Sequence, residues 1–100
     1  MSGKVAVITG GANGLGKASA LRFTEEDAKG IVIADMLEEA GLETVSMIKD
    51  AGGKAIFVNL DAINRVNNQE MVEAAVTEFG SIDVLVTAAG ITHQDYLSGD

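Results

Sequence analysis

Residues 5–16 read VAVITGGANGLG, a short apolar run that leads directly into a glycine-rich turn. The run Val5–Thr9 lacks the polar–apolar alternation of a half-exposed strand, and it is typical of a strand buried on both faces of a parallel sheet. A turn of small residues that opens a helix leaves the first N–H groups of that helix accessible, and these groups bind phosphate. The stretch therefore predicts an α/β fold with an anion-binding first turn.

The rest of the chain repeats this alternation of buried strand and helix. Strands are expected at residues 5–9, 31–35, 55–58 and 84–88, and helices at 15 to about 28, 37–51 and about 67–79. Gly30 is expected to stop the first helix. Asn67, with Glu70 three residues later, is a capping signal for the third helix. The apolar face of that helix is expected to hold Val72, Ala75, Val76 and Phe79. Residues 91–100 are left unassigned.

The expected connections decide the topology. Helical crossovers make the strands parallel, and right-handed crossovers place them, numbered along the chain, in the order 3-2-1-4. We therefore expect a Rossmann-like three-layer α/β/α fold, in which a four-stranded parallel sheet carries about three helices. The first two helices lie on one face and the third on the other. Residues 1–100 are expected to form a single domain of this kind.

Composition narrows the classes of partner and site. Seven basic residues against fifteen acidic ones give a net charge of −8, which argues against binding nucleic acid or an anionic membrane surface. The absence of cysteine and the single histidine exclude thiolate chemistry and Cys- or His-rich metal sites. No apolar run approaches the ~18 residues of a membrane span. The N-terminus lacks the pattern of a signal peptide. We expect a soluble, cytoplasmic protein without a metal site.

The glycines of the first turn have the spacing G-x3-G-x-G. Gly10 is expected to let the chain leave the strand sharply, and Gly14 and Gly16 to let the backbone approach a pyrophosphate. An ordinary glycine-rich loop is the alternative for such a motif taken alone. However, Asp35 ends the next strand about twenty residues further on, as the dinucleotide fingerprint requires. The combination predicts dinucleotide binding.

Asp35 also bears on the choice of cofactor. Its carboxylate is expected to accept hydrogen bonds from both hydroxyls of an adenosine ribose and to repel a 2′-phosphate. Neither Asn13 nor Met36 offers a cation to such a phosphate, and Lys17 is interpreted as a solvated helix charge. These residues predict NAD rather than NADP.

With these motifs the chain resembles the classical short-chain dehydrogenase/reductase family. Asp35 matches the NAD-selecting acid of that family, and Asp61 resembles the acid that binds the adenine amino group. The segment 83–90 resembles the fourth-strand segment of the family, and Gly90 is expected near the ribose on the nicotinamide side. The resemblance implies cofactor-binding residues at Gly10, Asn13, Gly14, Leu15, Gly16, Asp35, Met36, Asp61, Ala62, Ala89 and Gly90.

Two departures from the family pattern affect the expected function. Thr87 and Ala88 replace paired asparagines, which predicts looser packing of the fourth strand. The catalytic serine of the family and its Tyr-x-x-x-Lys pair are not found in this sequence. Tyr96 is the only tyrosine, and the residue four positions later is Asp100 and not lysine. An acidic neighbour disfavours the ionised tyrosine that such chemistry needs, so Tyr96 is interpreted as a packing or surface residue. No catalytic residue is expected in this chain.

Three functions remain open on the sequence. The first is the NAD(H)-binding portion of a short-chain dehydrogenase-like oxidoreductase, without hydride transfer of its own. The second is an oxidoreductase whose catalytic part comes from another chain or from an oligomer. The third is a non-catalytic interaction protein.

The fourth strand bears on self-association. Its run Val84-Leu85-Val86 is apolar and free of lysine and proline, so its edge is a template for pairing. The sheet face over the first and fourth strands is also expected to expose an apolar patch. We therefore expect a homo-oligomer that covers this edge or face.

Overall fold

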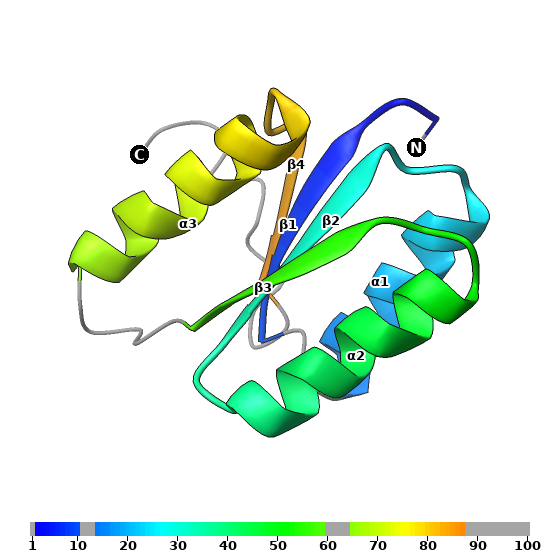
Figure 1. Ribbon diagram of the computed structural model, residues 1–100, viewed down its shortest axis with the longest axis horizontal. Coiled ribbons are helices and arrows are strands. Elements are labelled where there is room, and N and C mark those ends of the chain that lie inside the picture. The colour runs from blue at the N-terminus through cyan, green and yellow to red at the C-terminus, as the bar shows by residue number, and fades with distance from the viewer. Residues whose placement is uncertain (1, 11–13, 60–64, 88–100) are drawn as a thin grey trace.

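The computed structural model describes residues 2–10, 14–59 and 65–87. Its elements follow in the order β1 (Val5–Thr9), α1 (Gly14–Glu25), β2 (Gly30–Asp35), α2 (Glu38–Asp50), β3 (Ala55–Asn59), α3 (Arg65–Phe79) and β4 (Val84–Thr87). Figure 1 shows α1 and α2 on one face of the sheet and α3 on the other. The expected three-layer arrangement is therefore confirmed. Within the described ranges, no helix is long and apolar enough to cross a membrane.

The sheet has the order predicted from right-handed crossovers. All pairings are parallel, and the strands lie in the order β3-β2-β1-β4. Val5 lies opposite Gly30, and Ile31 lies opposite Ala55, so neighbouring strands start nearly level. The order places β1 and β2 in the centre and leaves β4 at an edge of the sheet formed by the described strands.

Alternate residues of the central strands point into two separate apolar layers. Val5 and Val7 of β1 pack with the residues of α3, whereas Ile8 packs with those of α1 and α2. In β2, Val32 and Ile33 divide between the two layers in the same way. Because both faces of each central strand are covered, every position must be apolar, and this is why β1 and β2 are unbroken apolar runs.

The turn between α1 and β2 differs from the sequence-based expectation. α1 ends at Glu25, and the non-glycine residue with a left-handed backbone in the turn is Asp27, with φ 63°. The prediction that Gly30 stops the helix is therefore wrong, because Gly30 is the first residue of β2. Its missing side chain serves packing: an added Cβ would overlap the ring of Phe79 from α3.

The start and the buried face of α3 also differ from the expectation. The helix begins at Arg65, so the predicted cap at Asn67 is wrong. Its sheet-facing stripe consists of Met71, Ala75 and Phe79, whereas Val72 and Val76 are 45% and 48% exposed. Residues four apart share one stripe of a helix, and a neighbouring residue is turned by about 100°. Ala75 and Phe79 were correctly placed on the buried face, and the two valines were not.

Exposed apolar surface is found on α3 and not over β1. Val5, Ala6, Val7 and Ile8 are 0% exposed, so the expected apolar patch over this strand is wrong. The side chains of β4 from residue 84 to residue 86 are half-buried. The sheet contacts of α3 involve β1, β2 and β3, and Val72 and Val76 are exposed apolar residues of this helix.

Gly41 of α2 provides a test of this packing, because an added Cβ would overlap the ring of Phe57 from β3. Alanine normally stabilises a helix relative to glycine by roughly 0.5–1 kcal/mol, whereas overpacking costs roughly 1–3 kcal/mol. We therefore expect Gly41→Ala to lower the free energy of unfolding, measured in urea, by about 1 kcal/mol. In a Phe57→Leu background the same substitution is expected to be neutral or stabilising. An equal loss in both backgrounds would show that the ring is not the obstacle.

Candidate functional site

The carboxyl ends of the strands meet at the edge of the sheet from which α1 and α2 start (Figure 1). At this edge Thr9 lies opposite Ala34, and Asp35 lies opposite Asn59. Ligands of open parallel sheets bind at this edge, beside the point where the strand order reverses. In the order β3-β2-β1-β4 this point lies between β1 and β4.

Gly10 makes the turn out of β1. Its φ is 74°, in the left-handed region that favours glycine. Its N–H donates to the carbonyl oxygen of Ala34 at 2.8 Å, so the chain is still bonded to β2 when it turns. Ala34 directly precedes Asp35. The first turn and the predicted ribose-binding carboxylate are thus joined through one backbone hydrogen bond, although they are about 25 residues apart in the sequence.

The start of α1 follows this turn, and the first N–H groups of a helix have no partner within the helix itself. Gly14 is the first residue of the helix, with φ 53°, and an added Cβ there would meet no atom within 4 Å. Gly16 is buried, as a close approach of helix and strand requires. The first turn of α1 contains no acidic residue, and its neighbour Leu15 is exposed. An accessible helix N-terminus without a carboxylate of its own attracts an anion.

Asp35 closes β2 and is half-buried. Its Oδ1 accepts a hydrogen bond from the backbone N–H of Leu37 at 2.9 Å. This contact holds one oxygen of the carboxylate against the start of α2. Met36, between the two residues, is 61% exposed. Asp side chains often accept from the backbone N–H two residues further on, so Asp35 itself was a sequence signal for this contact.

The first turn of α2 adds further negative charge next to Asp35. Glu38 and Glu39 are exposed in this turn. An open, shallow depression of about 490 Å³ is lined by Met36, Leu37, Glu38, Glu39, Ala40 and Glu43. These carboxylates make the electrostatic potential beside Asp35 negative.

The described residues include part of the predicted site. Asn13, Asp61, Ala62, Ala89 and Gly90 lie outside the described residues, as do Ala88 and Tyr96. Thr87 is the last residue of β4 and lies opposite Thr9. In the part of the chain that the structure describes, no group of three or more His, Cys, Asp or Glu residues could hold a metal ion.

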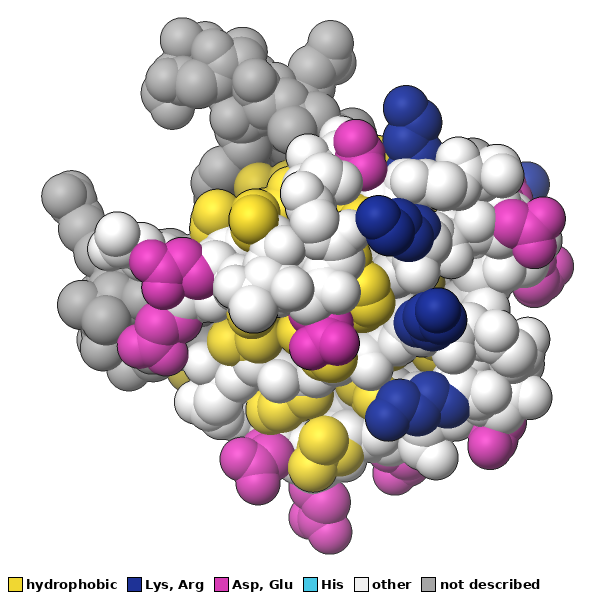
Figure 2. Space-filling view, turned by 45° about the horizontal axis from the view of Figure 1, so that its top comes forward, with side chains coloured by type: hydrophobic (Ala, Val, Ile, Leu, Met, Phe, Trp, Pro, Cys, Tyr) yellow, Lys and Arg dark blue, Asp and Glu magenta, His cyan; other side chains and the backbone are white. Residues whose placement is uncertain are grey.

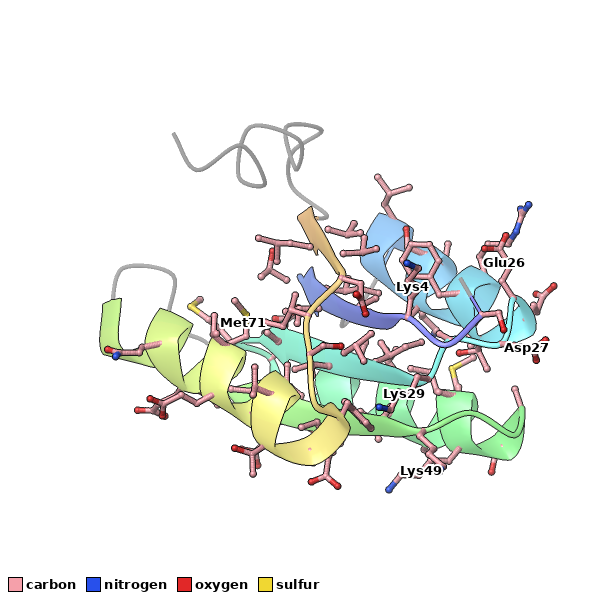
Figure 3. The ribbon with its side chains drawn as sticks, turned by 90° about the horizontal axis from the view of Figure 1, so that it is seen from above. Lys4, Glu26, Asp27, Lys29, Lys49 and Met71 are labelled. Atoms are coloured by element: carbon pink, nitrogen blue, oxygen red, sulfur yellow. The ribbon has the colours of Figure 1, made fainter. Side chains whose placement is uncertain are left out.

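The amino ends of the strands carry cations instead. Lys4, Lys29 and Lys54 directly precede β1, β2 and β3. Figure 2 shows a column of dark-blue Lys and Arg side chains across this end of the molecule. Figure 3, which looks onto it, shows Lys4, Lys29 and Lys49 following one another from the α1 side to the α2 side. These lysines lie at the end of the sheet opposite to the start of α1.

Asp83 lies at this same end and has a structural role. Its Oδ2 accepts from the N–H of Val5 at 2.8 Å and from the hydroxyl of Ser81 at 3.2 Å, and its own N–H donates to the carbonyl oxygen of Val5 at 2.9 Å. The bond from Val5 is the main reason why the pKa of this carboxyl is lowered, with smaller contributions from Ser81, Lys4 and Lys29 and an opposing one from desolvation. Asp83 therefore joins the starts of β4 and β1.

Comparison with known proteins agrees with this geometry. The family model for the short chain dehydrogenase matches residues 4–98. The 2,5-dichloro-2,5-cyclohexadiene-1,4-diol dehydrogenase of Sphingobium indicum is 47% identical over 93 residues, covering 93% of this chain and 37% of that protein. An uncharacterized oxidoreductase of Thermotoga maritima is 44% identical over 89 residues, covering 89% of this chain and 34% of that protein. The chain thus spans roughly a third of the length of the curated relatives it matches.

Solved structures show the same similarity. A short chain dehydrogenase/reductase from Burkholderia phymatum, in complex with NAD, has a TM-score of 0.81 and 38% identity over 84% of this chain and 30% of that one. A hydroxysteroid dehydrogenase from Escherichia coli has a TM-score of 0.82 and 30% identity over 86% of this chain and 36% of that one. This chain is therefore similar to these two proteins in sequence as well as in fold.

The lowered pKa of Asp83 predicts a pH dependence of stability. A carboxyl whose pKa is lower in the folded chain stabilises it above the unfolded pKa, near 3.8, and this contribution is lost as the pH falls through the folded pKa. Asp83→Asn keeps an oxygen acceptor for Val5 but removes the charge. We expect the stability difference between wild type and this variant, measured by urea unfolding, to be constant at neutral pH and to shrink below about pH 4. Asp50→Asn, at the exposed end of α2, is the control. A stability difference that does not change with pH would contradict a stabilising role of the ionised Asp83 carboxylate.

Proposed function

Because this chain belongs to the short chain dehydrogenase family, we propose that it binds NAD(H) through the turn between β1 and α1 and through Asp35. The chain corresponds to the N-terminal, cofactor-binding portion of such oxidoreductases. The observation that carries the proposal is the hydrogen bond from Gly10 to Ala34, which brings the accessible start of α1 next to Asp35. A dinucleotide has the matching chemistry, since its diphosphate is anionic and its ribose carries two hydroxyl donors.

The residues present fit this cofactor. The bare start of α1 would hold the diphosphate through backbone N–H groups, and the Asp35 carboxylate would accept from the adenosine ribose. The cofactor supplies the hydride chemistry when bound. Gly10, Gly14 and Gly16 keep side chains out of its way, and Asp35 orients its adenosine half. For the positions outside the described residues, Asn13, Asp61, Ala62, Ala89 and Gly90, we propose the contacts that the family resemblance implies.

We propose that NAD is preferred over NADP. Asp35 would repel a 2′-phosphate, and Glu38 and Glu39 in the first turn of α2 add negative charge nearby. The similar structure from Burkholderia phymatum is a complex with NAD. We also propose the cytoplasm, the compartment of a large NAD pool, as the place where this protein acts.

The role of Asp35 can be tested by NADH titration calorimetry. Hydrogen bonds to charged groups contribute roughly 1.5–3 kcal/mol, so we expect Asp35→Ala to weaken NADH binding by about tenfold to a hundredfold. The preference for NADH over NADPH should decrease at the same time, because the repelling charge is gone. Asp50→Ala removes one charge from the far end of α2 and is expected to bind as the wild type does. Unchanged affinity in Asp35→Ala would refute the assignment.

A second candidate is an oxidoreductase completed by further polypeptide. The observation that favours it is that the chain spans roughly a third of relatives whose names are dehydrogenase or oxidoreductase. Under this proposal the acid–base group for hydride transfer comes from another chain or from an oligomer. NADH absorbance with a panel of alcohols and ketones tests it. Turnover by this chain alone would indicate that an oligomer completes the site.

We propose that the chain self-associates through α3 and the edge of β4. Val72 and Val76 are exposed on the outward side of α3, and β4 is the last described strand on its side of the sheet. Burying the two valines is favourable because apolar surface leaves water, and the edge of β4 in the described sheet offers backbone groups for pairing with a second copy.

The size of the particle in solution tests this surface. By light scattering at micromolar concentration, the wild-type chain should exceed its monomer mass of 10.3 kDa. Val76→Glu is expected to shift it toward the monomer, since a charge would be buried in the contact. Thr77→Glu places the same charge at an exposed neighbouring position of α3 and serves as the control. A wild-type chain that remains a monomer would exclude this association.

A further inference from the structure

Three exposed lysines lie side by side at the amino end of the sheet. Lys4, Lys29 and Lys54 directly precede β1, β2 and β3, which are neighbours in the sheet. The N–H of Lys29 donates to the carbonyl oxygen of Lys4 at 2.8 Å, and the N–H of Ile31 donates to that of Lys54 at 3.0 Å. Neighbouring strands lie about 4.8 Å apart, so these residues form a row about 10 Å long. We call Lys4, Lys29 and Lys54 the lysine row.

The lysine row is not neutralised by the residues around it. Among the described residues, none of its three members forms an ion pair. Asp83 is a carboxylate on which they act, since Lys4 and Lys29 help to lower its pKa, but it already accepts from the N–H of Val5 at 2.8 Å. Like charges at this spacing repel one another. A chain of net charge −8 thus gathers cations at one place and leaves them without paired carboxylates.

Stabilisation of the helix ends explains part of this arrangement. A cation near the C-terminus of a helix is favourable, but the effect is confined to the last turn. Lys29 has such a position, because its Nζ would lie 3.7 Å from a Cβ added to Gly80, directly after α3. The last turns of α1 and α2 each contain a basic residue of their own. Lys4 precedes every helix, and Lys54 follows the end of α2 by four residues, so the helix ends do not explain the whole row.

The surroundings of the lysine row restrict the anion that it can receive. Asp27 is exposed in the turn between α1 and β2 (Figure 3), and Asp50 is exposed at the end of α2. A nucleic acid or an anionic bilayer presents charge over an area wider than the row, and it would meet these carboxylates as well. An extended polypeptide is narrow, and its side chains on one face repeat about every 7 Å. The flexible four-carbon stems of lysine can reach carboxylates at that spacing.

We propose that the lysine row is a docking surface for an acidic, extended segment of a partner protein, whose aspartate or glutamate side chains pair with Lys4, Lys29 and Lys54. At physiological ionic strength, charges beyond about 8 Å are largely screened, so the row and not the net charge decides the local attraction. The row lies at the amino end of the sheet and the candidate nucleotide site at its carboxyl end, so both can be occupied together.

Fluorescence anisotropy with a fluorescein-labelled peptide of six glutamates tests the docking surface. Exposed ion pairs each change affinity by roughly 1.4- to 5-fold, so the triple variant Lys4→Gln, Lys29→Gln, Lys54→Gln should bind the peptide roughly threefold to a hundredfold more weakly. Lys54→Glu alone should weaken binding by roughly two- to twentyfold. Lys17→Glu is its matched control, because it makes the same charge change in the first turn of α1, at the opposite end of the sheet. We expect this control to bind as the wild type does.

Two further measurements locate the peptide. Raising NaCl from about 50 to about 500 mM should weaken wild-type binding strongly, since the paired charges are exposed. In NMR spectra, the peptide should shift the amide signals of the lysine row and leave those at the start of α1 unchanged. Saturating NADH should not alter peptide binding. Peptide binding without NADH binding would therefore refute the proposed function and support the docking surface.

Several results would overturn the docking surface. One is the absence of binding at millimolar peptide and low salt. Another is an equal loss in Lys54→Glu and Lys17→Glu, which would mean that only net charge matters. Amide shifts at the start of α1 would mean that the peptide occupies the anion-binding turn. Tighter binding of inorganic tripolyphosphate, or of phosphatidylserine vesicles, would show that the row receives phosphate and not a polypeptide. If the triple variant does not fold, the single exchange at the exposed Lys54 decides the question.

Discussion

The hydrogen bond from the N–H of Gly10 to the carbonyl oxygen of Ala34 is the contact on which the candidate site depends. It extends the pairing of β1 and β2 by one residue beyond β1, while the backbone of Gly10 is already turning toward α1. A side chain at this position would strain the left-handed backbone, so the turn needs glycine. As a result, the start of α1 and the carboxylate of Asp35 are held at neighbouring strand ends by the rigid centre of the sheet.

The two ends of the sheet carry different charged and polar groups. At the carboxyl end, backbone donors at the start of α1 lie beside the carboxylates of Asp35 and α2. At the amino end, lysines precede three of the four strands, and Asp83 joins β4 to β1 through Val5. Cations there suit the negative ends of the helices that finish at this edge. The molecule thus separates the charges that stabilise its fold from the groups that would receive a dinucleotide.

Where sequence reasoning failed, tertiary packing had overridden a local signal. Gly30 looks like a helix stop, but it is glycine because the ring of Phe79 lies against its backbone. Asn67 and Glu70 look like a cap, but α3 starts two residues earlier. Val72 and Val76 share an apolar pattern with Ala75 and Phe79, and the choice of Met71 as the third buried residue depends on how the helix is rotated over the sheet. Rotation about a helix axis is decided by the shapes of both packed surfaces.

The sequence by itself determined the fold class, the strand order and the position of the glycine-rich turn between β1 and α1. Unbroken apolar runs require burial on both faces, and right-handed crossovers leave few arrangements of four parallel strands. Tertiary structure decided the contacts between residues far apart in the chain: Gly10 with Ala34, Phe79 with Gly30, and Val5 with Asp83. No pattern in the sequence indicates which of these distant residues meet, because backbone donors and acceptors are present at almost every position and only the folded path of the chain brings particular ones together.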